Sequence, residues 1–348
     1  MTRMLLLLSV ALLSCGLRAE SVETKAGSGD VKHNGRNNLY AQRDDVQAFI
    51  AEMHSRHGFD TESLTELFRR TRPIAAVIKA IMPPKDPGVR SWQAYRARFV
   101  EPSRIAAGRR FMSVYAAQLA AAEAQFGVPA DIIAAIIGVE TIYGKQLGHF
   151  GTFAALTTLA FDYPPRAELF RRELEELLLL AREEDRDPLG YTGSYAGALG
   201  LPQFLPSSHR RFALDFDRDG RIDLTGSATD AIGSVANFLA GHGWEREAPV
   251  ATTVTVSGEG VQALLDEGIV PQRLPQQMQT SSVSLAGVGA GATVIADRPA
   301  ALIDLVTPNA LTEYRLGYRN FYVITRYNRS SFYAAAVMDL AAAFRVSQ

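Results

Sequence analysis

The chain has 348 residues, 47% hydrophobic and 21% charged, which is enough for two or three domains with a substantial core. This composition excludes a mainly disordered or fibrous protein. The 36 Lys and Arg residues nearly balance the 37 Asp and Glu residues, so the net charge of −1 gives no footprint for nucleic acid. A single Cys and six His exclude an internal disulfide framework and give no Cys/His metal cluster.

The first 19 residues have the pattern of a secretory signal. Arg3 precedes an almost wholly apolar run from Met4 to Leu13, which is too short to span a bilayer. The only cysteine, Cys15, closes this run after a small residue, as in bacterial lipoprotein signals; ordinary cleavage near Ala19 is the alternative. We therefore predict a periplasmic protein, anchored to the outer membrane by a lipid on Cys15. Residues 20–40, rich in Ser, Gly, Asn and Lys, predict a flexible tether.

Most of the chain after the tether has helical periodicity. The apolar spacing that begins at Asp45 is helical, and the prolines around Pro83 and Pro87 then interrupt it. Further helices are expected at 91–98, 103–126, 130–142, 152–160, 166–184 and 230–242. We interpret residues 41–249 as one helical core.

The pattern changes after Pro249. Residues 251–257 alternate like a strand, 260–267 fit a short helix, and 281–297 alternate again. The glycine-rich stretch from Gly287 predicts a β-turn rather than a phosphate loop, because no glycine-rich helix start follows it. We predict a small β-rich domain at 250–312 and a segment at 313–348 that returns to the core.

One helix carries a carboxylate in a nearly continuous apolar setting. Between Asp131 and Tyr143 almost every position is apolar, so the helix should be buried, with Glu140 near its C-terminal end. Burial and the negative end of the helix dipole both raise the pKa of such a carboxyl. A carboxylic acid that stays protonated near neutral pH can act as a general acid. On this pattern alone, a Glu that simply reaches solvent from the helix end remains the alternative.

Three segments together resemble the membrane-bound lytic murein transglycosylase B family. They are Gly138-Val-Glu-Thr-X-X-Gly144, the stretch from Ser194 through Gln203 to Ser208, and Arg326-Tyr-Asn328 with Tyr333. The resemblance spans about residues 45–345. It implies a mainly α fold, in which a lysozyme-like α+β core carries an additional helical domain and a small β-rich domain. It also implies cleavage of the bond between N-acetylmuramic acid and N-acetylglucosamine in the glycan strands of peptidoglycan.

The same resemblance assigns roles to individual residues. Glu140 is implied to be the sole acid and base, forming 1,6-anhydromuramoyl ends with help from the substrate's acetamido group. Substrate contacts are implied at Tyr95, Arg166, Ser194, Gln203, Tyr327, Asn328 and Tyr333. Where the family often has a pair of arginines after Tyr-Pro, this chain has only Arg166. Other cell-wall enzymes are further candidate partners.

An acidic loop satisfies half of a calcium-binding pattern. Asp215, Asp217 and Asp219 stand at the first, third and fifth positions, followed by Gly220. The twelfth position is Gly226 rather than Glu. The family resemblance implies a longer loop that closes on a later carboxylate, here Asp230, with Arg221 supplying its backbone carbonyl. We expect no cofactor for catalysis and a structural Ca²⁺ in loop 215–230; a solvated turn is the alternative.

Other functions remain as alternatives. A hydrolytic muramidase would share Glu140 but needs a positioned water, and a non-catalytic peptidoglycan-binding scaffold would keep the aromatic residues alone. A serine hydrolase is poorly supported, because the sequence around Ser194 lacks the Gly-X-Ser-X-Gly elbow.

Overall fold

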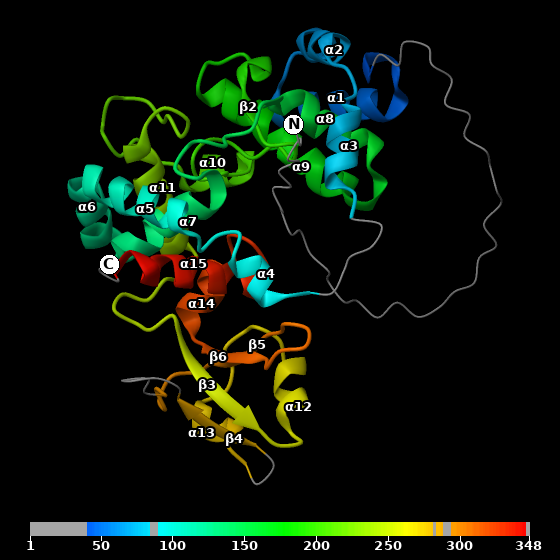
Figure 1. Ribbon diagram of the computed structural model, residues 1–348. Helices are drawn as coiled ribbons and strands as arrows, with labels where there is room; N and C mark the ends of the chain where they lie inside the picture. Colours follow the sequence, from blue (N-terminus) through cyan, green and yellow to red (C-terminus); the bar gives the residue numbers. More distant parts are fainter. Residues whose placement is uncertain (1–39, 84–89, 281–282, 288–293, 346–348) are drawn as a thin grey trace, which may run out of the picture. The chain divides into compact units, whose positions relative to one another are not determined.

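A computed structural model describes residues 40–83, 90–280, 283–287 and 294–345 (Figure 1). The fold is mainly helical with small antiparallel sheets, which confirms the predicted fold class. The signal segment with Cys15, the tether up to residue 39 and most of the glycine-rich stretch after Gly287 lie outside the described residues.

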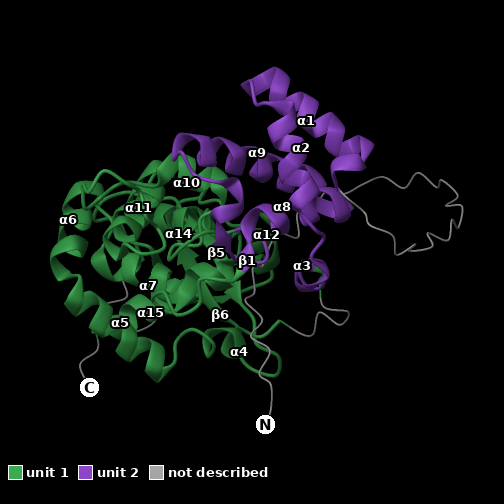
Figure 2. Ribbon diagram, turned by 90° about the horizontal axis from the view of Figure 1, so that it is seen from above, with its two compact units in different colours: residues 1–11, 82–149, 198–348 green, residues 12–81, 150–197 purple. Residues whose placement is uncertain are grey.

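The chain forms two compact units, each assembled from separate segments (Figure 2). In the described residues, unit 1 contains 82–149 and 198–345 with their gaps, and unit 2 contains 40–81 and 150–197. This division differs from the predicted boundaries. The expected core 41–249 is shared between both units, and the β-rich region belongs to unit 1 instead of standing apart.

Unit 2 is mostly helical. Its elements are η1 (Tyr40–Gln42), α1 (Asp44–His57), α2 (Thr61–Arg70), α3 (Ala75–Ile81), β1 (Phe150–Gly151), α8 (Thr152–Asp162), η2 (Pro164–Arg166), α9 (Ala167–Glu183), η3 (Pro188–Gly190) and β2 (Thr192–Gly193). Helix α8 packs against α9 and α3, and the two-residue strands β1 and β2 pair antiparallel. Asp60, the residue before α2, caps this helix by accepting a hydrogen bond from the N–H of Ser63.

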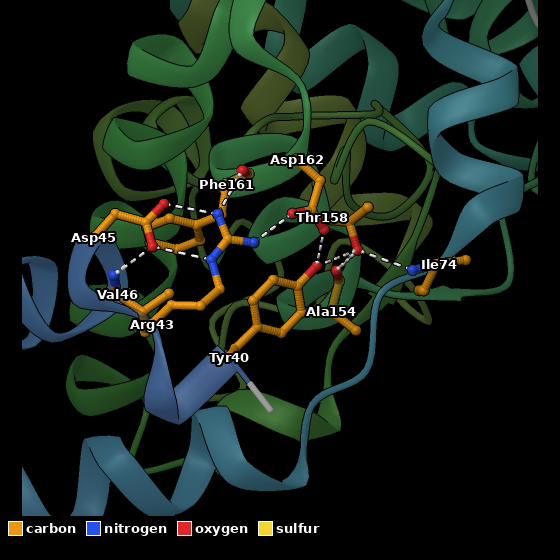
Figure 3. A network of polar contacts seen from close by, with 9 residues as sticks. All are labelled: Tyr40, Arg43, Asp45, Val46, Ile74, Ala154, Thr158, Phe161 and Asp162. Atoms are coloured by element: carbon orange, nitrogen blue, oxygen red, sulfur yellow. Dashed lines mark hydrogen bonds and ion pairs between the residues drawn. The ribbon is translucent and has the colours of Figure 1, made fainter. Parts of the chain in front are cut away.

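A polar network joins the two segments of unit 2 (Figure 3). The buried Tyr40 donates its hydroxyl to Asp162 at 2.5 Å, and Arg43 binds the other oxygen of the same carboxylate. Arg43 also donates to the carbonyl of Phe161 at 2.8 Å, so a cation meets the C-terminal end of α8. These contacts attach residues 40–45 to the helix that precedes Arg166.

Unit 1 contains the remaining helices and a four-stranded sheet. Its helices are α4 (Trp92–Arg96), α5 (Pro102–Val114), α6 (Ala116–Phe126), α7 (Ala130–Thr141), α10 (Pro206–Phe212), α11 (Ala228–Gly241), α12 (Val261–Asp266), α13 (Pro275–Met278), α14 (Arg319–Ile324) and α15 (Ser331–Arg345). The strands are β3 (Ala251–Ser257), β4 (Ser284–Gly287), β5 (Ala301–Leu305) and β6 (Glu313–Gly317).

The single helix expected at 103–126 is two helices. The chain turns at Tyr115, whose φ of −107° and ψ of 29° are not helical. Helix α5 packs against α7 and α15, whereas α6 packs against α11 and α7. Different packing partners thus favour the break, although the residues around Tyr115 contain no Gly or Pro that would signal it.

The sheet has the order β4-β3-β6-β5, with every neighbouring pair antiparallel. Its strand β6 lies beyond the predicted limit of 312, because residues 313–317 pair with both β3 and β5. One face of the sheet buries Val254, Leu302 and Leu316 in a small apolar cluster. The sheet is therefore part of unit 1 through β6, which continues almost directly into α14.

Helix α7 lies in the main core of unit 1. Every residue from Asp131 to Val139 is buried, and α15, α5, α11 and α6 pack around the helix. Among the described residues, no single helix is long and apolar enough to cross a membrane. The helices α6 and α7 pass such a test only as a pair bent by 113°.

Candidate active site

Glu140 stands where α7 leaves the core. It is the first residue after Asp131 in this helix that is not fully buried, and the helix that leads to it is apolar. The helix ends at Thr141, and the next two residues, Ile142 and Tyr143, take the left-handed conformation with φ of 52° and 56°. Such a conformation costs free energy in non-glycine residues, and strained backbone is concentrated at functional sites.

Thr141 connects the end of α7 to a neighbouring turn. Its buried hydroxyl lies 3.0 Å from the carbonyl oxygen of Leu201, to which it donates, and it accepts a hydrogen bond from the N–H of Gly144 at 3.1 Å. The turn itself is closed by reciprocal backbone hydrogen bonds between Leu199 and Phe204. Thr141, the residue after Glu140, therefore attaches the end of α7 to this turn, a role that sequence reasoning missed.

The carboxyl group of Glu140 is bound by a tyrosine from the other end of the chain. Tyr333, in the first turn of α15 and 2% exposed, donates its hydroxyl to Oε1 of Glu140 at 2.6 Å. Within the described part of unit 1, this is the single hydrogen bond to the Glu140 side chain.

Burial raises the pKa of Glu140 to about 7, and the hydrogen bond from Tyr333 opposes this shift. Loss of hydration penalises the charged form, so the carboxyl keeps its proton close to neutral pH. No second carboxylate in the described part of unit 1 contributes to the shift. A single acid with this pKa is suited to give a proton and take one back.

Two further tyrosines, Tyr95 and Tyr327, are close enough to Glu140 to be affected by its charge. Burial, and to a smaller extent the charge of Glu140, raises the pKa of Tyr95 and Tyr327. The ring of Tyr327 stacks on that of Tyr333 with centroids 6.4 Å apart, and its hydroxyl donates to the carbonyl of Pro202 at 2.7 Å. The structure therefore brings together Tyr95, Tyr327, Tyr333 and Glu140, four of the residues to which the family resemblance assigns roles.

Gln203 and Asn328 lie next to these groups. Gln203 occupies the tight turn with a φ of 53°, and its side-chain amide donates to the carbonyls of Gly200 and Leu147. Asn328 follows Tyr327 directly, and its buried Oδ1 has no hydrogen-bond partner among the described residues. A buried, unsatisfied acceptor is uncommon, so this oxygen is a candidate contact for a substrate donor.

The other two expected contacts belong to unit 2 and are described within it. Ser194 is 4% exposed and follows β2, and its carbonyl accepts a hydrogen bond from the N–H of Gly197. Arg166 ends η2, with its guanidinium 5.6 Å from the ring centroid of Phe170.

The acidic loop gathers three of its carboxylates. One oxygen each from Asp215, Asp217 and Asp230 lies within 4.8 Å of the other two. Asp230 is 1% exposed, and burial, together with the nearby charge of Asp217, raises its pKa. Asp219 is not in this group; its Oδ1 accepts a hydrogen bond from the N–H of Arg221. Three convergent oxygens with one buried carboxylate fit a hard cation such as Ca²⁺.

The acidic loop is also connected to the turn that carries Gln203. The N–H of Leu201 donates to the carbonyl of Leu224 at 2.7 Å, and a Cβ at Gly200 would collide with the same carbonyl. The turn therefore lies directly between the acidic loop and Thr141 at the end of α7.

The chain is similar to known proteins over nearly its whole length. Residues 41–342 match the Transglycosylase SLT domain family. The chain is 35% identical to membrane-bound lytic murein transglycosylase B of Escherichia coli, covering 99% of this chain and 97% of that protein. This chain belongs to the Transglycosylase SLT domain family.

Two solved structures have the same fold. Soluble lytic transglycosylase SltB1 from Pseudomonas aeruginosa is 43% identical with a TM-score of 0.79, covering 86% of this chain and 98% of that one. The lytic transglycosylase Slt35 of E. coli, solved in complex with calcium, is 37% identical with a TM-score of 0.75, covering 88% of this chain and 94% of that one. Both confirm the predicted lysozyme-like transglycosylase fold.

Glu140→Gln should stabilise the protein increasingly as pH rises. The wild-type carboxyl ionises near pH 4.5 when unfolded but only near pH 7 when folded, so folding opposes its ionisation. The wild type therefore loses stability between these two pH values, by at most about 3.5 kcal/mol at about 1.4 kcal/mol per pKa unit, and the neutral amide does not. Thermal unfolding of both proteins from pH 4 to 9 measures the difference. A constant difference across this range would show that Glu140 has an ordinary pKa.

Proposed function

We propose that this chain is a peptidoglycan lytic transglycosylase in which Glu140 is the only acid and base. The observation that carries the proposal is the position of Glu140 at the end of the buried helix α7, where Tyr333 donates to its Oε1 and no second carboxylate acts on it in the described part of unit 1. Burial at this position raises the pKa of Glu140 to about 7. The family membership supports the same reaction class.

In the reaction, Glu140 first donates a proton and then accepts one. Tyr333 occupies Oε1, so the proton resides on Oε2 and is given to the glycosidic oxygen as its bond to C1 of the muramoyl residue breaks. The substrate's own 2-acetamido group stabilises the positive charge at C1, which removes the need for a second carboxylate. The Glu140 carboxylate then takes the proton from the C6 hydroxyl, O6 bonds to C1, and a 1,6-anhydro ring forms without water.

The surrounding residues bind and orient the sugars. We assign Ser194 to the acetamido group, Gln203 and Asn328 to sugar hydroxyls, and Tyr95, Tyr327 and Tyr333 to the walls beside the scissile bond. Arg166 is assigned to the glycan or its peptide. The buried, unpartnered Oδ1 of Asn328 supports its assignment, because a sugar hydroxyl would supply the missing donor.

Products should carry 1,6-anhydromuramoyl ends and contain no oxygen from labelled water. Internal closure is favoured over attack by water because a well-placed intramolecular nucleophile has an effective molarity that reaches about 10⁵–10⁸ M. Digestion of purified peptidoglycan in H₂¹⁸O followed by mass analysis measures this. Reducing ends labelled with ¹⁸O would instead identify a hydrolytic muramidase.

In the same assay Glu140→Gln should lose about 10²–10⁴-fold in turnover, which is the usual contribution of general acid–base catalysis. The exposed Glu259→Gln variant is the matched control and should remain active. Normal turnover by a folded Glu140→Gln protein would show that Glu140 is not the catalytic acid.

Loop 215–230 is proposed to bind a structural Ca²⁺. Asp215, Asp217 and Asp230 provide the convergent carboxylates, and Asp219 and the Arg221 carbonyl are the remaining candidate ligands from the sequence. Slt35, a relative of similar fold, has been solved in complex with calcium. By holding the loop, the ion would stabilise Leu224 and, through it, the turn that carries Gln203.

Calcium should raise the melting temperature, because a ligand that binds only the folded state stabilises it. A hundredfold excess of free Ca²⁺ over the Kd corresponds to about 2.7 kcal/mol. Asp215→Ala with Asp217→Ala should abolish the shift, whereas Asp266→Ala, which removes an exposed carboxylate elsewhere, should retain it. Melting curves that are identical in EDTA and in excess calcium would identify the loop as a solvated turn.

The enzyme is further proposed to act in the periplasm, attached to the outer membrane through lipid on Cys15. The relative from E. coli is described as membrane-bound. Cys15→Ala should move the protein from the membrane fraction to the soluble periplasm of a Gram-negative host, which fractionation and immunoblotting measure. A native protein that is soluble and begins beyond Cys15 would exclude the anchor.

A further inference from the structure

Helix α5 carries a buried arginine beside α7. Arg104 is 8% exposed, and its guanidinium lies 5.3 Å from the ring centroid of Phe99. Arginine is almost never this buried without partners, because the charge loses its hydration. The position therefore indicates a specific interaction rather than a solvated surface charge.

The partners of Arg104 are the backbone carbonyls that precede Glu140. Its Nη1 donates to the carbonyl of Gly138 at 2.7 Å and lies 3.4 Å from that of Val139. These carbonyls belong to the last turn of α7, where the helix dipole is negative. The carbonyl of Gly138 also accepts a hydrogen bond from the N–H of Ile142 at 3.2 Å, so Arg104 adds a second, charged donor to an acceptor that has two lone pairs.

We infer that Arg104 is a positioning residue that fixes the last turn of α7 and thereby aims the carboxyl group of Glu140. The inference rests on the proposed function, in which Glu140 is the acid and base. The peptide group between Val139 and Glu140 contains the second of the two carbonyls, so any movement of that carbonyl turns the Cα of Glu140 with it.

Neighbouring residues fix the start of α5 and allow α5 to approach α7 closely. Glu101 caps the start of α5 by accepting hydrogen bonds from the N–H groups of Ser103 and Arg104. Behind Arg104, the phenol of Tyr143 packs between Gly108 of α5 and Gly138 of α7, where a Cβ on either glycine would collide with its hydroxyl. The left-handed conformation of Tyr143 and the two glycines hold the helices close enough for Arg104 to reach the carbonyls.

The positive charge of Arg104 also has an electrostatic consequence. The groups that act electrostatically on Glu140 or are affected by it are Tyr333 of α15, Tyr327 after α14 and Tyr95 of α4. Those that act on Arg104 are Glu101 and Tyr143. From the place of Arg104 at the negative end of α7, we expect its charge to favour the ionised form of Glu140. Its removal should then raise the pKa of Glu140 and extend activity to higher pH.

The test compares Arg104→Met, Arg104→Lys and Arg104→Gln with the wild type on a soluble muropeptide oligosaccharide. Arg104→Met should lower kcat about 10- to 100-fold, because a displacement of about 1 Å costs that much, and leave KM within about twofold. The basic limb of its pH profile should move upward. Arg104→Lys keeps the charge and should recover part of kcat and the original limb, although it lacks the forked geometry.

Arg109→Met is the matched control. Arg109 also lies on α5 and donates to a C-terminal carbonyl, but to that of Ala343 in α15, ten residues beyond Tyr333. Its replacement should lower stability while kcat and the pH profile stay at their wild-type values. Both variants thus remove a cation from a helix end, and only Arg104→Met changes the helix end beside Glu140.

A folded Arg104→Met protein with wild-type kcat and an unchanged basic limb would overturn the inference and assign Arg104 to stability alone. If Arg104→Met does not fold, the neutral Arg104→Gln and the charged Arg104→Lys decide. If the basic limb of the pH profile moves in Arg104→Gln but not in Arg104→Lys, the inference is supported. If the basic limb is the same in both variants, the inference is overturned. Glu140→Gln, assayed alongside, distinguishes a failure of the proposed function from a failure of the inference about Arg104. Continued activity of Glu140→Gln would contradict the proposed function. An inactive Glu140→Gln together with a normal Arg104→Met would contradict only the role of Arg104.

Discussion

The chemistry of this protein depends on placing an ionisable group at the end of a helix that is buried on all sides. From Ile132 to Val139, helix α7 contains only apolar residues and one glycine, so the core of unit 1 packs around it. Glu140 then enters an environment with little water, and its carboxyl keeps a proton near neutral pH. Helix α7 also ends directly after Glu140 and Thr141, because Ile142 and Tyr143 take the left-handed conformation.

The packing of α15 against α7 completes the site. The two helices contact each other at both ends: Tyr333 binds Glu140 at one end, and Arg345 forms an ion pair with Asp131 at the other. Alanines of α15 are buried at this interface, which allows close approach of the helices. Because α15 contacts α7 at both ends, the position of the Tyr333 hydroxyl depends on the packing of the whole helix α15 and not only on its first turn.

The turn around Gln203 connects three otherwise separate features. Thr141 attaches it to the end of α7, Tyr327 to the aromatic group, and Leu224 to the acidic loop. The left-handed backbone at Gln203 is maintained only because these neighbours determine its position. A cation in the acidic loop would therefore act on the same turn that presents Gln203, without touching the substrate.

The sequence by itself determined the features that depend on neighbouring residues: the apolar helix with Glu140 near its end, strand β3, and the spacing of Asp215 and Asp217. Periodicity and turn residues are local properties, so they can be recognised in one sequence. Only the tertiary structure decided the break at Tyr115, the assembly of each unit from separate segments and the bond from Tyr333 to Glu140. Tyr333 and Glu140 are 193 residues apart, and such contacts depend on how whole helices pack, which no local pattern encodes.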